Sequence, residues 1–165
     1  MLLTGAADAP QAGISAPSQE AALAVEAYAQ ALQAATPPGR WVGTFSQYDS
    51  REGTTETEAI DECVTTHAPA SFLRPYSAIL QGIANVGPTG KTCTVIPGAA
   101  GTLDLGISCN LEGGAAVLKA SAAGSAKPGE VEVALNIGVE AAAPKVASLS
   151  STVRRTGDCE ASLKP

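Results

Sequence analysis

The feature that most constrains the fold is a regular alternation of side chains over residues 130–139. Aliphatic residues occupy every second position, and charged, polar or small residues lie between them, in the order Glu130, Val131, Glu132, Val133, Ala134, Leu135, Asn136, Ile137, Gly138 and Val139. Because successive side chains of a strand point to opposite faces, this pattern predicts a strand with one face in a core and the other in water. A sheet with one wet face is typical of antiparallel pairing.

Six other segments have a strand-like composition and are separated by turns rich in glycine or proline. They cover residues 40–48, 54–64, 91–96, 102–111, 115–122 and 146–155. Together with residues 130–139 they predict a mainly β fold. We expect a single antiparallel sheet of about seven strands that is strongly curved or closed into a small barrel.

Two segments favour helix instead. Residues 19–32 are rich in alanine and follow Ser18, a suitable N-cap, so they predict an N-terminal alanine-rich helix. We expect this helix to dock loosely, through a face formed by Leu23, Ala27, Tyr28, Ala31 and Leu32. A short apolar stretch over residues 76–83 predicts one or two further helical turns.

The 165 residues have room for one domain with its own core. We expect residues 1–9 to be the remnant of a signal peptide, because Ala7-Asp8-Ala9 fits a small-x-small cleavage pattern. No basic residue precedes Arg40, so the basic front of such a peptide is absent, and an N-terminus without a targeting role is the alternative. We expect a linker and helix over residues 10–37, a disulfide-stabilised β domain over 38–160 and a tail over 161–165.

Four cysteines occur, at positions 63, 93, 109 and 159, and none of their spacings is that of a zinc site or a redox pair. The chain has a single histidine. An even number of cysteines without metal-site spacing predicts two disulfides, and hence an oxidising compartment such as the periplasm or the extracellular space. Four buried free thiols are the alternative.

The pairing of the cysteines follows from the register of a hairpin. If the turn over residues 97–101 is centred at Gly101, Val95 lies opposite Ile107 and Cys93 lies directly opposite Cys109. We therefore predict a Cys93–Cys109 disulfide. The two remaining cysteines, Cys63 and Cys159, each end a strand. Joining them would tie the second strand to the last and fix both ends of the sheet.

Several short motifs together resemble a family of exported bacterial proteins, the domain of unknown function 3617. They are Pro38-Gly39-Arg40-Trp41 at the first strand, Cys63, Cys93-Thr94-Val95, Cys109, and Arg154-Arg155-Thr156-Gly157-Asp158-Cys159 at the last strand. The resemblance covers about residues 38–159. It departs at Thr156, where the family usually has an aliphatic residue. It implies a periplasmic or secreted β-rich domain and no known activity.

The motifs that suggest chemistry have simpler structural explanations. Gly90-Lys91-Thr92 lacks the upstream glycine of a phosphate-binding loop and precedes a strand instead of a helix. His67 lies in a loop, with no nucleophile motif elsewhere. Arg154 and Arg155 point to opposite faces of a strand and so do not form a phosphate clamp. A hydrolase is therefore the least favoured function.

Six acidic residues lie within residues 49–62, and Glu56, Glu58 and Glu62 share one strand face. Paired carboxylates could serve a glycosidase or hold calcium. A solvated strand face, which would also protect an edge strand from aggregation, is the simpler interpretation. We expect no catalytic residue, no metal site and no cofactor.

The net charge of −6 argues against nucleic acid and anionic membranes as partners, and no apolar run is long enough to span a bilayer. The leading interpretation is a non-enzymatic periplasmic domain that binds a small apolar ligand or an envelope protein partner. A structural or stress-related envelope protein without a ligand is the alternative. A cavity open to solvent would favour ligand binding, and a filled interior would favour an interaction protein. The residues expected to face a barrel interior, or else to fill a small core, are Trp41, Phe45, Leu105, Ile107, Val133, Leu135 and Leu149.

Overall fold

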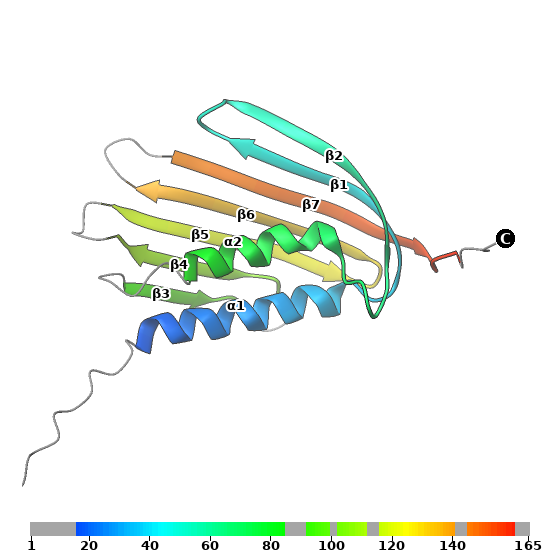
Figure 1. The fold of residues 1–165 in the computed structure, drawn as a ribbon, viewed down its shortest axis with the longest axis horizontal. Coiled ribbons are helices and arrows are strands. Elements are labelled where there is room, and N and C mark those ends of the chain that lie inside the picture. Colours follow the sequence, from blue (N-terminus) through cyan, green and yellow to red (C-terminus); the bar gives the residue numbers. More distant parts are fainter. Residues whose placement is uncertain (1–15, 85–91, 100–101, 112–115, 141–144, 161–165) are drawn as a thin grey trace, which may run out of the picture.

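The computed structural model describes residues 16–84, 92–99, 102–111, 116–140 and 145–160. The chain forms a single seven-stranded antiparallel sheet with both α-helices lying across the same face (Figure 1). The elements, in chain order, are α1 (Ala16–Ala35), β1 (Gly39–Asp49), β2 (Thr54–Val64), the 3₁₀ helix η1 (Ser71–Leu73), α2 (Arg74–Ala84), β3 (Thr92–Pro97), β4 (Leu105–Asn110), β5 (Val117–Lys127), β6 (Glu130–Glu140) and β7 (Lys145–Gly157). We call the side of the sheet that carries the helices the helix face, and the opposite side the bare face.

The strand order is β2-β1-β7-β6-β5-β4-β3, so β2 and β3 are the two edges. The expected mainly β, antiparallel fold is confirmed, as are all seven expected strands within a few residues at their ends. The barrel alternative is wrong, because β2 and β3 do not pair and the sheet stays open. The two helices occupy the side around which a barrel would have to close.

Helix α1 is part of the core and does not dock loosely. Its buried residues are Ala21, Val25, Tyr28 and Leu32, which follow one another at helical spacing. The expected contact face is confirmed at Tyr28, Ala31 and Leu32. It is wrong at Leu23, which is 60% exposed, and at Ala27, which is exposed as well. Alanine and valine at the true contact face let the helix lie close to the sheet, where it packs along β3 and against α2.

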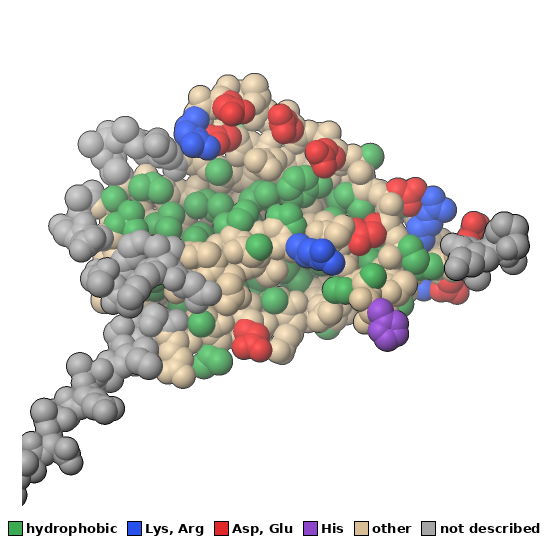
Figure 2. Space-filling view, in the orientation of Figure 1, with side chains coloured by type: hydrophobic (Ala, Val, Ile, Leu, Met, Phe, Trp, Pro, Cys, Tyr) green, Lys and Arg blue, Asp and Glu red, His purple; other side chains and the backbone are tan. Residues whose placement is uncertain are grey.

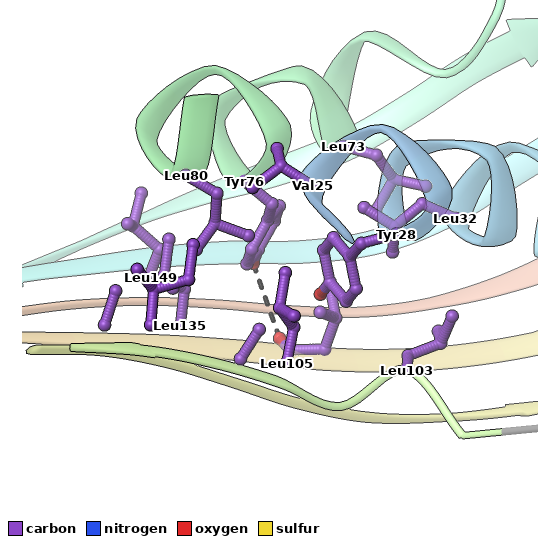
Figure 3. Close-up of a cluster of buried hydrophobic side chains, with 14 of the residues drawn as sticks. Val25, Tyr28, Leu32, Leu73, Tyr76, Leu80, Leu103, Leu105, Leu135 and Leu149 are labelled. Atoms are coloured by element: carbon purple, nitrogen blue, oxygen red, sulfur yellow. Dashed lines mark hydrogen bonds between the residues drawn. The ribbon is translucent and has the colours of Figure 1, made fainter. Parts of the chain in front are cut away.

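Helix α2 confirms the helical turns expected near residue 80 and extends them to eleven residues. Its buried residues are Tyr76, Leu80, Ile83 and Ala84. The Tyr76 hydroxyl donates a hydrogen bond of 2.8 Å to Ser151 Oγ on β7, which fixes the helix to the middle of the sheet (Figure 3). No helix among the described residues is both long enough and apolar enough to span a bilayer.

Both predicted disulfides are present, Cys93–Cys109 and Cys63–Cys159. The register of the β3–β4 hairpin is the predicted one, with Cys93 opposite Cys109 and Val95 opposite Ile107. The second disulfide ties β2 to the end of β7, but it does not fix both ends of the sheet. Strand β7 lies third from the β2 edge, with β1 between them.

Candidate functional site

The residues expected to face a ligand lie mostly in the core. Six of the seven are buried between the sheet and the two helices, namely Trp41, Leu105, Ile107, Val133, Leu135 and Leu149. Figure 3 shows how side chains from both helices, including Val25, Tyr28 and Leu80, fill the space above them. Phe45 is the exception: it is half-buried and lines an open cavity.

That cavity lies on the helix face between the β1–β2 hairpin, η1 and the start of α2. It has a volume of about 440 Å³, and we call it the β2 groove. Its lining residues are Phe45, Glu58, Ala59, Ile60, Asp61, Glu62, Ser71, Phe72 and Pro75. The space-filling view shows hydrophobic side chains gathered along the middle of this face, below a margin of acidic side chains over the β1–β2 hairpin (Figure 2). The groove thus joins an apolar surface to an acidic rim.

Strand register brings the groove residues together. Phe45 lies opposite Glu58 in the β1–β2 pair, and Gly43 lies opposite Ile60, so all four positions belong to the helix face. Gly43 has no room for a side chain, because a Cβ there would overlap the backbone of Thr152 and Val153 on β7. Glycine therefore permits the close approach of β1 to β7 at the base of the groove.

Glu62 holds the end of the groove nearest the helices. Its carboxylate accepts hydrogen bonds from the Ser71 backbone N–H, at 2.8 Å, and from Ser71 Oγ, at 2.6 Å. These bonds satisfy a donor at the start of η1 and place Phe72 beside β2. Glu62 is thus a structural link between an edge strand and the first helical turn.

Two other carboxylates on the same face have no such link. Glu56 and Glu58 are exposed, and within the described part of the chain neither forms an ion pair or a hydrogen bond. Together with Glu62 they confirm the prediction that three acidic side chains share one strand face. The rim of the β2 groove therefore carries negative charge that the described residues do not neutralise.

Among the described residues, no basic side chain pairs with these two carboxylates. Arg40 binds Asp61 through two hydrogen bonds of 2.8 and 2.7 Å, and this contact holds the pKa of Asp61 below its usual value. Arg51 pairs with Asp49 at the tip of the hairpin. Arg74 lines a separate cavity of about 180 Å³ beside the end of α1.

Two tyrosines form the most polar part of the core. Burial raises the pKa of Tyr76 to about 12, an effect that its hydrogen bond to Ser151 partly opposes. Burial also raises the pKa of Tyr28, assisted by the nearby Tyr76 and Asp104. The Tyr28 hydroxyl is buried, and among the described residues it has no hydrogen-bond partner. Both phenols stay neutral near pH 7, so neither is activated as a nucleophile or a base.

The remaining sequence candidates are placed as follows. His67 is exposed in the loop after β2. Gly90 and Lys91 lie outside the described residues, and the strand expected after them is β3. Arg154 and Arg155 alternate along β7, where Arg155 pairs with Asp158 and donates a hydrogen bond to the Pro38 carbonyl. Within the described ranges, no cluster of His, Cys, Asp and Glu side chains is arranged to hold a metal ion.

The sequence analysis missed the η1 side of the groove. Phe72 and Pro75 follow a loop, and no local pattern indicates which strand they contact. One signal for the groove is present in the sequence, the alternation of Glu56, Glu58, Ile60 and Glu62. The single apolar residue in this acidic strand face indicates where the face contacts other apolar side chains.

No protein-family profile, curated protein or solved structure matches the chain. The resemblance to the domain of unknown function 3617 therefore depends on the quoted motifs alone.

Proposed function

We propose that this chain is a non-enzymatic, extracytoplasmic interaction domain that holds an apolar group of a protein partner in the β2 groove. One observation carries the proposal: the space between sheet and helices is filled by side chains, while an open cavity of about 440 Å³, lined by both apolar and acidic residues, lies at the surface beside an edge strand. A filled interior leaves no lumen for a small ligand. An open groove with apolar side chains in its lining suits an inserted side chain of another protein.

The extracytoplasmic location is supported by the two disulfides. Such bonds persist in oxidising compartments and are rare where thiol reductants are abundant. One bridge joins the strands of the β3–β4 hairpin and the other joins two strands that are not neighbours in the sheet. The resemblance to exported proteins points to the same location.

The non-enzymatic role is supported by the state of the reactive side chains. All four cysteines are in disulfides, so none is a free nucleophile. The single histidine is exposed in a loop and is not among the residues that line the groove. The groove carboxylate Glu62 is held by Ser71, which leaves Phe45, Ile60, Phe72 and Pro75 as the main contact surface.

Site-specific photocrosslinking in cells that express the full gene tests this function. The photoreactive residue p-benzoylphenylalanine is placed at Phe45, in the groove, or at Tyr48, which lies on the same strand but on the bare face. Both positions are aromatic and half-buried, so the two variants are matched in size and setting. We expect a protein adduct from position 45 and none from position 48.

Two results would contradict the proposal. Equal adducts at both positions would show that the groove is not the contact surface. An adduct of only a few hundred daltons at position 45 would identify a small apolar ligand instead of a protein. Peptide mapping of both disulfides in each variant serves as the control for correct folding.

A further inference from the structure

The outer edge of β2 is the longest unpaired strand edge in the described sheet. Strand β2 has eleven residues and pairs on one side only, with β1. Its first six residues are all exposed. An edge strand presents a row of unpaired N–H and C=O groups, which is a template for another strand. The opposite edge, β3, has six residues, ends at Pro97 and packs against α1, so it offers a much poorer template.

The side chains beside this edge indicate which strands it accepts. On the helix face, β2 presents Glu56, Glu58, Ile60 and Glu62 in succession, with Glu62 engaged by Ser71. Side chains directly opposite one another on neighbouring strands lie about 4.5–5.5 Å apart. A strand added beside β2 therefore brings its alternate side chains next to two free carboxylates and one isoleucine.

Charge excludes one class of occupant and favours another. A second copy of β2 would place glutamates beside glutamates, and like charges on neighbouring strands are destabilising. The same carboxylates attract a basic strand. Among the described residues, no basic side chain forms an ion pair with Glu56 or Glu58.

We propose that β2 accepts an extended basic segment of a partner protein as an eighth strand of the sheet. Basic side chains of that segment lie beside Glu56 and Glu58, and an apolar side chain beside Ile60 enters the β2 groove against Phe72. Main-chain hydrogen bonds supply affinity in this mode of recognition, and the alternate side chains supply specificity. The inference rests on the function proposed above and names the chemical class of the partner.

Fluorescence anisotropy with two labelled nine-residue peptides tests this inference on the intact, oxidised protein. One peptide is Thr-Thr-Lys-Thr-Lys-Thr-Leu-Thr-Thr and the other is its reverse, since the added strand can run in either direction. We expect saturable binding of at least one of them. Replacing both lysines by glutamate is expected to weaken binding at least tenfold.

N-methylation of the peptide backbone separates strand pairing from simple charge attraction. Alternate amides of a strand point to opposite sides, so one methylated set blocks hydrogen bonds to β2 and the other set faces solvent. We expect one set to weaken binding at least tenfold and the other to change it less than twofold. Equal effects of the two sets would overturn the inference.

Matched variants of the protein locate the contact. Glu56→Gln combined with Glu58→Gln is expected to weaken peptide binding about three- to tenfold at low salt, because exposed ion pairs contribute modestly. Glu130→Gln combined with Glu132→Gln makes the same charge change on the exposed bare face of β6 and should leave binding unchanged. An equal loss in both variants would overturn the proposed location.

The two proposals fail in different ways. A protein adduct at Phe45 together with equal effects of the two methylated peptides would leave the groove function standing and remove strand addition. A dimer of the peptide-free protein by analytical ultracentrifugation that becomes tighter in the Glu56→Gln, Glu58→Gln variant would also overturn the inference, because the β2 edge would then bind a second copy.

Discussion

The two hairpins at the edges of the sheet differ in how far the helices cover them. The β3–β4 hairpin has six-residue strands, lies beneath α1 and buries Cys93, Leu105, Ile107 and Cys109. The β1–β2 hairpin has eleven-residue strands, and the helix face of β2 is largely exposed. The helix face of β4 carries Leu105, Ile107 and Cys109, whereas that of β2 carries three glutamates and Ile60. The helices cover the first hairpin and leave a groove over the second.

The comparison shows that an apolar side chain on an alternating strand becomes core only where a helix covers it. Ile107 on β4 and Ile60 on β2 illustrate the point, because both project from the helix face. Ile107 is 1% exposed beneath the helices, whereas Ile60 is half-buried and lines the β2 groove. An apolar side chain without a helix over it is available to another molecule, and for that reason we propose that the function lies at the β1–β2 hairpin.

The largest expected effect comes from removing the Cys63–Cys159 disulfide, which anchors the β1–β2 hairpin. Cys63→Ala combined with Cys159→Ala should lower the free energy of unfolding by up to about 4–5 kcal/mol, because that bond spans 96 residues. Cys93→Ala with Cys109→Ala should cost about 3 kcal/mol, because its loop spans 16 residues. Urea denaturation under non-reducing conditions measures both. A larger loss of stability on removing Cys93–Cys109 would contradict this order. It would show that the β3–β4 hairpin depends more on its disulfide than the β1–β2 hairpin does.

The next largest effect compares the two isoleucines directly. Ile107→Ala should lower the free energy of unfolding by about 3 kcal/mol, because it leaves a cavity in a fully covered region. Ile60→Ala should cost only about 1 kcal/mol, because that side chain is already partly in contact with water. The same denaturation experiment provides the numbers. Equal costs would mean that the β2 groove is packed as tightly as the core.

A smaller effect distinguishes Tyr28 in α1 from Tyr76 in α2, the two helices that cover the sheet. Tyr76→Phe should cost about 1–2 kcal/mol, because it leaves the buried Ser151 hydroxyl without its partner. Tyr28→Phe should be neutral or stabilising by up to about 1 kcal/mol, because it removes a buried hydroxyl without a partner among the described residues. A cost for Tyr28→Phe similar to that of Tyr76→Phe would indicate that the Tyr28 hydroxyl is hydrogen-bonded in solution.

Because of the same tyrosines, the free energy of unfolding should depend on pH in the alkaline range. Tyrosines of the unfolded chain ionise near pH 10, whereas burial raises the pKa of Tyr76 to about 12 and that of Tyr28 as well. Above pH 10 the unfolded state therefore loses protons that the folded state keeps, and the free energy of unfolding falls as pH rises. We expect a loss of roughly 2 kcal/mol between pH 9 and 11, about half of it from each tyrosine, that the Tyr28→Phe, Tyr76→Phe variant does not show.

The strands and the Cys93–Cys109 disulfide could be predicted because both depend on local patterns, and Cys63–Cys159 is the pair of cysteines that then remains. Alternation is visible within each strand, and the turn between residues 93 and 109 is short enough to define one register. Glu56, Glu58 and Glu62 were correctly assigned to one strand face for the same reason.

The packing of the helices on the sheet could not be predicted from the sequence. Small alanine side chains give α1 several nearly equivalent faces, so the choice of Ala21, Val25, Tyr28 and Leu32 is made by the sheet beneath it. The open sheet and the groove follow from where the helices lie, which depends on contacts such as Tyr76 with Ser151, 75 residues apart in the chain. No short window of sequence contains such contacts.

The Cys63–Cys159 bond also determines how the domain would carry tension between its ends. A pull on the two termini passes through that bond, so the 96-residue span it closes, from α2 to β7, lies outside the line of force. Only α1 and the β1–β2 hairpin, which precede Cys63, can unravel. A contour length of about 330 Å stays locked within the closed loop. The hairpin with the open groove is therefore also the first part of the sheet to yield under load.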